Sequence, residues 1–489
     1  MATGSYINGK WFHPASKQLV RNINPADPTD IIAEFPAATG KDVQAAVEAA
    51  ESAFPQWKNT PGPERGRILW RAADIARKRS DEIARIMTRE EGKILKESVG
   101  EVMKGIALLE YYAGAGFRMG GQTLPTEGVD MFAYTLRRPL GVVGLILPFN
   151  FPWACPVWKS APALIAGNTI VMKPADLTPS TAALLIEIYA EAGVPPGVIN
   201  MVTSCGSEVG EAIVNAPAVR AISFTGSNPV GEAIYARAAT LQKKVTCEMG
   251  GKNALVVLAD ANLEFAAAAI LNGAFGSTGQ RCTATSRVIV MPEVKDALLE
   301  ILVNQTKQLK VGNGLDETVD MGPAVDERQL KRDFDYIEIA KGEGARLLCG
   351  GNRPAHLTQG FFIEPTIFDN VLPTARIFKE EVFGPVLSIA TAKDLEQALQ
   401  FANSVEYGLT TALFTEDINS AMHYINEVET GMIHINEATI GGEAQLPFGG
   451  TKATAIGDRE MSDEGLNFFT ETKTVFINYA KTKQRSSLR

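Results

Sequence analysis

The spacing of apolar residues divides the chain into a helical first part and a longer region of alternating strands and helices. In residues 41–54 and 63–99 apolar residues recur every three or four positions with charges between them, which predicts amphipathic helices. Thr39 and Asp42 have the spacing of a capping box at the start of the first helix. Gly92 is expected to weaken the longer helical run.

From residue 141 onward short apolar runs alternate with helical segments. We expect strands over 142–147, 169–172, 198–202, 221–224 and 245–247, and helices over 158–166, 180–192, 208–215 and 230–239. A second series begins with a strand over 253–258 and an Ala-rich helix over 263–275. Continuous apolar strands that alternate with helices are typical of a parallel sheet covered on both faces. The pattern therefore predicts an α/β fold, with residues 116–138 as an arm and a frayed basic tail after Tyr479.

Composition narrows the class of protein. The 489 residues are 45% hydrophobic and 21% charged, which is typical of a globular chain with two to four domains. The formal net charge of −9 argues against nucleic acid or an anionic membrane as a partner. Residues 1–40 lack a secretory signal, and prolines interrupt the most apolar stretch, 140–158, so we expect no membrane span.

The cysteines and histidines bear on the compartment and on metal binding. Five cysteines in so long a chain indicate reduced thiols in the cytoplasm rather than a disulfide framework; they are Cys155, Cys205, Cys247, Cys282 and Cys349. With four histidines and no zinc-ligand spacing, we expect no metal site.

Two turns that follow predicted strands carry groups suited to a nucleotide. Gly226 permits a tight turn, Ser227 offers a hydroxyl, and the N-terminus of the following helix can hold a phosphate. The spacing is not GxGxxG, and an ordinary turn between strand and helix explains it about equally well. Lys173 and Asp176 follow another strand, where they could bind phosphate and a ribose hydroxyl, although a solvated loop is the simpler interpretation.

Cys282 and Glu248 are candidates for catalysis. Cys282 lies in the polar segment STGQRCTAT, where Arg281 would favour a thiolate, whereas most cysteines are buried small apolar residues. Glu248 ends an apolar strand and precedes Gly250 and Gly251, which gives a general base room to move. A single glutamate at the end of a strand is, however, usually just solvated.

Seven motifs together resemble the aldehyde dehydrogenase superfamily, in its order and spacing and over essentially the whole chain. They are PFNFP at 148–152, KPAD at 173–176, FTGS at 224–227, EMGGK at 248–252, GQRCTA at 279–284, EEVFGPV at 380–386 and LPFGG at 446–450. Within the superfamily, the sequence is most similar to the branches that oxidise 2-oxoglutarate semialdehyde or succinate semialdehyde.

The resemblance implies specific roles. Cys282 matches the nucleophile, Asn150 matches the amide that holds the oxyanion together with the Cys282 backbone N–H, and Glu248 matches the base that activates water. The thiohemiacetal would pass hydride to the nicotinamide and leave a thioester for hydrolysis. The matching cofactor positions are Lys173, Asp176, Gly226 and Ser227 on the adenine side and Phe149, Glu381 and Phe383 on the nicotinamide side.

Two positions depart from the family pattern. Phe149 stands where many relatives have Trp, and Asp176 stands where they often have Glu. Either acid would repel a 2′-phosphate, so NAD is favoured over NADP, although NADP stays open.

The implied substrate residues are Arg281, Trp158, Phe151, Thr283, Lys104 and Phe448. Arg281 resembles an arginine that holds a distal anion, which favours a short aldehyde with a terminal anionic group, such as 2,5-dioxopentanoate or succinate semialdehyde. The simpler interpretation is that Arg281 supports the thiolate or a backbone carbonyl. Non-phosphorylating oxidation of glyceraldehyde 3-phosphate and broad aldehyde specificity remain alternatives, whereas Glu248 argues against transfer to CoA.

The family architecture implies a doubly wound NAD-binding domain, a catalytic α/β domain and a small β arm for oligomerisation. The expected boundaries are 1–119 with 139–247, then 248–465, and 120–138 with 466–489. We expect a strand over 473–478, in which residues 474–477 alternate as an edge strand would. We therefore expect a homodimer or homotetramer that acts on a small aldehyde.

Overall fold

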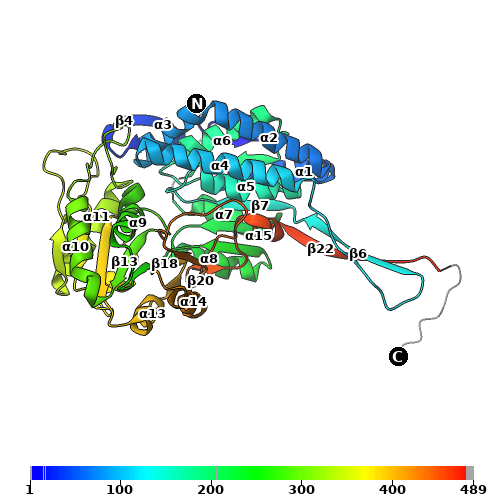
Figure 1. Cartoon of the computed structure of the whole chain (residues 1–489). Coiled ribbons are helices and arrows are strands. Elements are labelled where there is room, and N and C mark those ends of the chain that lie inside the picture. Colours follow the sequence, from blue (N-terminus) through cyan, green and yellow to red (C-terminus); the bar gives the residue numbers. More distant parts are fainter. Residues whose placement is uncertain (1–2, 15, 17, 205, 481–489) are drawn as a thin grey trace.

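The computed structural model of the chain describes residues 3–14, 16, 18–204 and 206–480. Two parallel-sheet units lie side by side, and a ribbon of two long strands projects from one of them (Figure 1). The predicted α/β fold class is therefore confirmed. Cys205 and the basic tail from residue 481 lie outside the described residues.

The first unit is built on an eight-stranded sheet in the order β2-β1-β9-β8-β7-β10-β11-β21. Its five central strands run parallel and match the predicted ones: β7 (Val142–Ile146), β8 (Thr169–Lys173), β9 (Ile199–Met201), β10 (Val219–Thr225) and β11 (Lys244–Glu248). Antiparallel strands close both edges: β1 (Ser5–Ile7) and β2 (Lys10–Phe12) at one, and β21 (Ala455–Ile456) at the other.

Helices cover both faces of this sheet. They are α1 (Gly40–Asn59), α2 (Gly62–Lys78), α3 (Ser80–Glu91), α4 (Leu95–Ala115), α5 (Ala154–Ala166), α6 (Pro179–Ala192), α7 (Glu208–Asn215) and α8 (Asn228–Thr240). The capping box of Thr39 and Asp42 is present. Residues 63–99, predicted as one weakened run, form two helices and the start of a third. The first break lies at Arg79, and the second follows Glu91, where Gly92 ends α3 with a φ of 99°. Figure 1 shows α4 lying alongside α5, and the two helices are in contact.

The N-terminal strands are not predicted by the sequence pattern. Besides β1 and β2, a ribbon of β3 (Leu19–Asn24) and β4 (Asp27–Pro36) precedes α1. Most of the β4 side chains are partly or fully exposed, so the strand lacks the apolar alternation by which strands are predicted. The predicted start of α5 is also too late, since Pro156 is tolerated in the first turn of this helix.

The second unit contains the predicted second α/β series. Its seven-stranded sheet has the order β14-β15-β16-β13-β12-β18-β19, in which β14 alone is antiparallel. The strands are β12 (Asn253–Val257), β13 (Thr285–Val290), β14 (Arg346–Cys349), β15 (Thr366–Asp369), β16 (Val386–Thr391), β18 (Thr410–Phe414) and β19 (Met432–Ile435). The helices are α9 (Leu263–Phe275), α10 (Pro292–Thr306), α11 (Glu327–Gly342), α12 (Arg376–Lys379), α13 (Leu395–Asn403) and α14 (Ile418–Glu427). Between α9 and β13 lies the 3₁₀ turn η1 (Gly276–Gly279). The remaining elements are β17 (Tyr407–Gly408), β20 (Thr451–Lys452) and α15 (Ser462–Phe468).

The arm is a three-stranded sheet in which β6 (Met131–Pro139) lies between β5 (Thr123–Leu124) and β22 (Thr470–Asn478). β22 pairs antiparallel with β6 over its whole length, from Thr470 opposite Pro139 to Asn478 opposite Met131. The arm extends away from both α/β units (Figure 1). The division into three domains stays a prediction; we note that β21, from the range 248–465, completes the edge of the first sheet. No helix in the described part of the chain is long and apolar enough to cross a membrane.

Candidate active site

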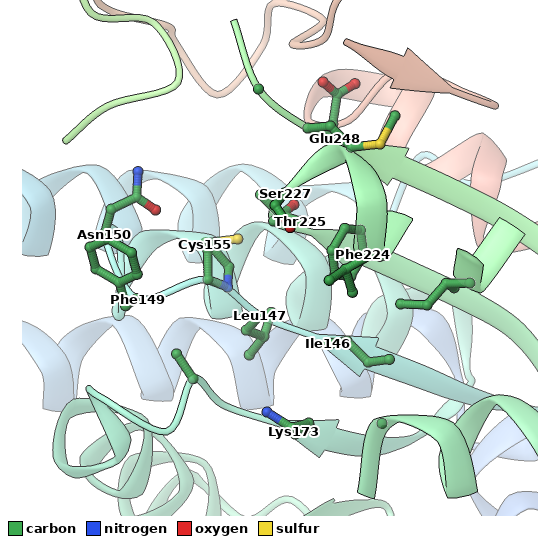
Figure 2. A pocket seen from close by; sticks show the side chains of 18 of the residues that line it. Ile146, Leu147, Phe149, Asn150, Cys155, Lys173, Phe224, Thr225, Ser227 and Glu248 are labelled. Atoms are coloured by element: carbon green, nitrogen blue, oxygen red, sulfur yellow. The ribbon is translucent and has the colours of Figure 1, made fainter. Parts of the chain in front are cut away.

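A cavity of about 1030 Å³ opens at the carboxyl ends of β7, β8, β10 and β11. Figure 2 shows Asn150 and Phe149 after β7, Lys173 at the end of β8 and Glu248 at the end of β11, all around this space. Thirteen of the sixteen predicted site residues line it: Cys282, Glu248, Asn150, Lys173, Asp176, Gly226, Ser227, Phe149, Glu381, Phe383, Trp158, Phe151 and Phe448. Arg281, Thr283 and Lys104 are not part of the lining.

Lys173 and Asp176 meet at one end of the cavity. The Lys173 Nζ lies 3.0 Å from Asp176 Oδ1, which also accepts a hydrogen bond from Ser204 Oγ at 2.8 Å. The other carboxylate oxygen accepts from the Gly206 backbone N–H at 2.9 Å. The acid is thus fixed by three partners at a strand end, where nucleotide-binding sheets hold a ribose.

The turn between β10 and α8 has the features of a phosphate site. Ser227 is the N-cap of α8, and its side chain makes no capping hydrogen bond, so the hydroxyl and the helix N-terminus are available to a ligand. A Cβ on Gly226 would lie 2.5 Å from the Phe224 ring, so this position requires glycine.

Glu381 and Phe383 lie on the opposite side, contributed by the second unit. Glu381 Oε1 accepts a hydrogen bond from the Gly251 N–H at 2.9 Å, and burial raises the pKa of its carboxyl. Phe383 has a φ of 64° and packs edge-on against Phe149, with 5.8 Å between ring centroids. Both rings line the cavity, so Phe149 and Phe383 together form part of its wall.

Cys282 follows η1, a turn in which Ser277, Thr278 and Gly279 have φ values of 49°, 57° and 67°. Its carbonyl accepts a hydrogen bond from Asn253 Nδ2 at 2.7 Å, whereas its own N–H has no hydrogen-bond acceptor within the described residues. Asn150 Nδ2 donates to the Gln280 carbonyl at 2.9 Å, which joins the amide to the loop of the nucleophile. The two predicted oxyanion donors thus belong to loops in direct contact.

The charge state of Cys282 depends on its surroundings. Burial, with smaller contributions from Glu381 and Glu248, raises the pKa of the thiol to about 12. The Lys104 ammonium and the Thr283 backbone N–H act in the opposite direction. Thr283 therefore supports the sulfur through its backbone, although its side chain is not in the cavity wall.

Glu248 ends β11 with both carboxylate oxygens buried and without a hydrogen-bond partner in the described chain. Burial raises the pKa of the carboxyl well above its usual range, Glu460 raises it further, and Lys159 partly offsets these effects. A Cβ on Gly449 would lie 2.3 Å from Oε1, so glycine makes room for the carboxylate there. In its ionised form, a buried and unpaired carboxylate with a raised pKa is a stronger base than an exposed one and is suited to accept a proton from water.

Arg281 does not point a free guanidinium at the substrate space. Its Nη2 lies 2.9 Å from Glu97 Oε1, and its Nε donates to Ser277 Oγ at 3.0 Å. The same Glu97 oxygen accepts the Ser277 N–H at 2.8 Å. These contacts favour a structural role for Arg281 in the loop of the nucleophile over the predicted role as a receptor for the substrate anion.

Lys104, by contrast, has no ion-pair partner or hydrogen bond among the described residues. Its Nζ lies 5.3 Å from the Trp158 ring centroid, and Trp158 packs against Phe448 at 5.6 Å. The Trp158 indole N–H donates to Glu460 Oε2 at 2.8 Å, which fixes the ring. Burial lowers the pKa of Lys104, and the Cys282 charge acts against that shift.

Three polar residues near the site are not predicted by the sequence motifs: Lys93, Glu97 and Glu101, before and within α4. A signal is present, because Glu97, Glu101 and Lys104 have the spacing of one helix face on an otherwise apolar helix. Such spacing is equally typical of a helix face exposed to solvent, so it does not predict that Glu101 is buried, as the structure shows.

Comparison with known proteins agrees with this geometry. Residues 11–475 match the model of the aldehyde dehydrogenase family. An alpha-ketoglutaric semialdehyde dehydrogenase of Bacillus subtilis (strain 168) is 45% identical over 475 residues, with 97% of each chain covered. A 2,5-dioxopentanoate dehydrogenase of Saccharolobus solfataricus is 44% identical over 470 residues, with 96% of this chain and 98% of the relative covered.

A solved structure of a relative shows the same fold. The crystal structure of betaine aldehyde dehydrogenase from Staphylococcus aureus, in complex with NAD⁺, has a TM-score of 0.96 and 34% identity. The match covers all of this chain and 97% of the other. The predicted resemblance is confirmed: this chain belongs to the aldehyde dehydrogenase family and is an aldehyde oxidoreductase.

Proposed function

We propose that this protein oxidises a short aldehyde with a terminal carboxylate to the corresponding dicarboxylic acid, with NAD as the favoured cofactor. The observation that carries the proposal is the convergence of Cys282, Asn150 and Glu248, distant in sequence, on one cavity. The two semialdehyde dehydrogenases described above, which cover nearly all of this chain, support a carboxylate-bearing substrate.

Cys282 would act as the nucleophile. Its thiolate attacks the carbonyl carbon and forms a C–S bond, while the carbonyl oxygen gains the negative charge. The free Cys282 N–H and the second hydrogen of the Asn150 amide donate to that oxygen, because the first already binds the Gln280 carbonyl. Each such donor typically contributes about 10²–10³ in rate.

Glu248 would complete the reaction. After the aldehyde carbon has lost a hydride, it is bound to Cys282 as a thioester. Glu248 takes a proton from water, the resulting hydroxide attacks the thioester carbon, and the C–S bond breaks to release the acid and the thiolate. The unpaired oxygens of Glu248 leave the lone pairs free for this proton.

The cavity has the groups that a nicotinamide dinucleotide requires. Lys173 and Asp176 would hold one ribose, the N-terminus of α8 with Ser227 the phosphates, and Glu381 the other ribose. When bound, the cofactor supplies the acceptor for the hydride. The negative charge of Asp176 disfavours a 2′-phosphate, so NAD is favoured over NADP.

The receptor for the substrate carboxylate would be Lys104 rather than Arg281. The Arg281 charge is already balanced by Glu97. Lys104, although it is not part of the cavity lining, has no carboxylate partner in the described chain and lies 5.3 Å from the ring of Trp158, which lines the cavity. An incoming carboxylate would give this partly buried ammonium the partner that it lacks.

The proposal also covers the assembly of the protein and its cellular compartment. The edge of β22 that faces away from β6 pairs with no other strand in the described chain, so the arm would join a second copy in a homodimer or homotetramer. The four described cysteines are free thiols, which supports a reducing compartment such as the cytoplasm.

The substrate is tested by comparing kcat/KM for succinate semialdehyde, 2,5-dioxopentanoate and the neutral methyl ester of succinate semialdehyde. We expect wild type to prefer the anions and Lys104→Met to reduce that preference about tenfold or more, since charged hydrogen bonds contribute about 1.5–3 kcal/mol. The ratio of anionic to neutral substrate is the measurement, because Lys104 also affects the thiol.

Exposed Lys96, on the same helix, provides the matched control as Lys96→Met. An unchanged preference in Lys104→Met, or its loss in Arg281→Met alone, would contradict the assignment of Lys104. Faster oxidation of glyceraldehyde 3-phosphate than of either semialdehyde would favour the phosphate-bearing substrate instead, and equal rates for all would indicate broad specificity.

A further inference from the structure

We infer that Lys93 and Glu101 are positioning residues that hold Asn150, the side-chain donor of the oxyanion hole, in its working orientation. The inference rests on the proposed function, because it concerns the donor that the proposed reaction uses. It starts from a buried ion pair that touches the loop of Asn150 at three backbone positions.

The contacts enclose the segment 150–154 from both ends. Lys93 Nζ donates to the Asn150 carbonyl at 2.6 Å and to Glu101 Oε2 at 2.8 Å. Glu101 Oε1 accepts hydrogen bonds from the backbone N–H groups of Trp153, at 2.9 Å, and Ala154, at 3.0 Å. A single ion pair therefore fixes the peptide of Asn150 and the first turn of α5 relative to each other.

The ion pair of Lys93 and Glu101 is buried and charged, so it can hold the Asn150 loop in one conformation. Both side chains are 1% exposed, so water does not compete for these hydrogen bonds. Burial lowers the pKa of Lys93, but the carboxylates of Glu101 and Glu91 more than offset this and leave it raised, so the ammonium stays charged. Buried ion pairs often add little to the free energy of unfolding. We therefore look for the effect of this ion pair in the placement of the Asn150 loop rather than in stability.

Asn150 itself is held at two points. Lys93 binds its backbone carbonyl, and its side-chain Nδ2 binds the Gln280 carbonyl in the loop of the nucleophile. The Lys93 ammonium also lies 4.5 Å from the centroid of the Phe151 ring, the next residue along. Loss of the Lys93 contact would free the peptide that follows Asn150 and allow the amide to turn away from the carbonyl oxygen.

Helix α4 also contacts the loop of the second oxyanion donor, the Cys282 backbone N–H. Glu97, one turn before Glu101, accepts the Ser277 N–H and pairs with Arg281 in the loop that precedes Cys282. A Cβ on Gly105 would lie 2.1 Å from the Trp153 indole nitrogen, so α4 is packed directly against the start of α5. One helix thus contacts both loops that supply the oxyanion donors.

The test uses hydrolysis of 4-nitrophenyl acetate by the full chain without cofactor. In this reaction the Cys282 thiolate displaces 4-nitrophenolate and forms an acetyl thioester, which water then hydrolyses, and both steps place charge on an oxygen in the same hole. The variants are Lys93→Met, Asn150→Ala and the double variant. The readouts are kcat, KM and Tm.

We expect Lys93→Met to lower kcat about 10–100-fold with little change in KM, since a misplacement of about 1 Å costs about 10² in rate. In the Asn150→Ala background the same substitution should lower kcat less than twofold. The Asn150 backbone carbonyl is still present there, so a merely structural effect of Lys93 would persist, and an equal loss in both backgrounds would overturn the inference.

Milder variants keep the test decisive if Lys93→Met does not fold. Glu101→Gln retains an acceptor for Trp153 and Ala154 but loses the ionic contact, and it should show the same dependence on Asn150. Glu90→Gln is the matched control, because Glu90 is a buried acid that binds the N-terminus of α6 instead, through Ser180 and Thr181. If Asn150→Ala alone leaves kcat unchanged, the oxyanion role in the proposed function fails rather than its positioning.

Discussion

Burial and two nearby carboxylates oppose the ionisation of Cys282 more strongly than Lys104 and the Thr283 N–H favour it. Burial raises the pKa of the thiol to about 12, and the nearby Glu381 and Glu248 add to the effect. A pKa raised in this way leaves the neutral thiol dominant at pH 8 in the chain without cofactor, and each added pH unit multiplies the thiolate fraction about tenfold. The reactivity of Cys282 should therefore rise steeply with pH.

Alkylation by iodoacetamide measures this directly. We expect the rate at Cys282 in the chain without cofactor to increase about tenfold per unit between about pH 7 and about pH 9.5, because a raised pKa leaves the neutral thiol dominant throughout. Lys104→Met should be slower than wild type, since Lys104 lowers the pKa of the thiol. Cys282→Ala provides the blank, and a plateau below about pH 9 would show that the thiol ionises far more easily than its burial implies.

The residues of the site differ in how far the sequence reveals them. Cys282 and Glu248 lie in compact motifs whose local composition already indicates chemistry, and both line the cavity. Lys93 and Glu101 are not predictable in this way because their contacts join positions 52 and 57 apart in the chain, and spacing within a helix does not show what lies opposite. The pairing of Arg281 with Glu97, 184 residues away, is hidden for the same reason.

At the scale of elements, the positions of the turns after parallel strands can be predicted from the sequence, whereas the strands at the edges of the sheets cannot. β7 to β11 are mostly buried and contain short apolar runs, whereas β1, β2 and β21 are two or three residues long and add to the sheet only through tertiary contacts. The rule that ligands bind at the carboxyl ends of parallel strands predicts the location of Lys173 and Asp176 from the sequence alone. Under the proposed function, we expect the turn after β8 to set the cofactor preference.

Asp176→Ser tests that turn. Removal of the carboxylate takes away repulsion of a 2′-phosphate and releases Lys173 to pair with it, so kcat/KM for NADP relative to NAD should rise about tenfold or more. Asp176→Glu is the matched variant, since it keeps the charge and should keep the preference. A change of less than twofold in Asp176→Ser would mean that Asp176 does not discriminate between the two cofactors.

At the scale of the whole molecule, the arm carries exposed apolar side chains and, at β22, a strand edge with no partner in the described chain. Phe476, on β22, is 68% exposed, and Phe132, on β6, is 43% exposed. Large apolar side chains on a projecting ribbon, one of them on its edge strand β22, are unusual for a surface that stays in water. The arm lies away from the cavity, so the proposed assembly through it would not involve the residues of the site.

Phe476→Glu should therefore disrupt assembly while it leaves the site of each subunit intact. We expect wild type to have the mass of a dimer or tetramer in size-exclusion chromatography with light scattering, and Phe476→Glu to shift toward the monomer at micromolar concentration. Phe476→Leu keeps an apolar side chain at the same place and should retain the wild-type mass. Since a charge on an apolar interface is costly and the same charge in water is not, equal masses for Phe476→Glu and wild type would show that the arm faces solvent.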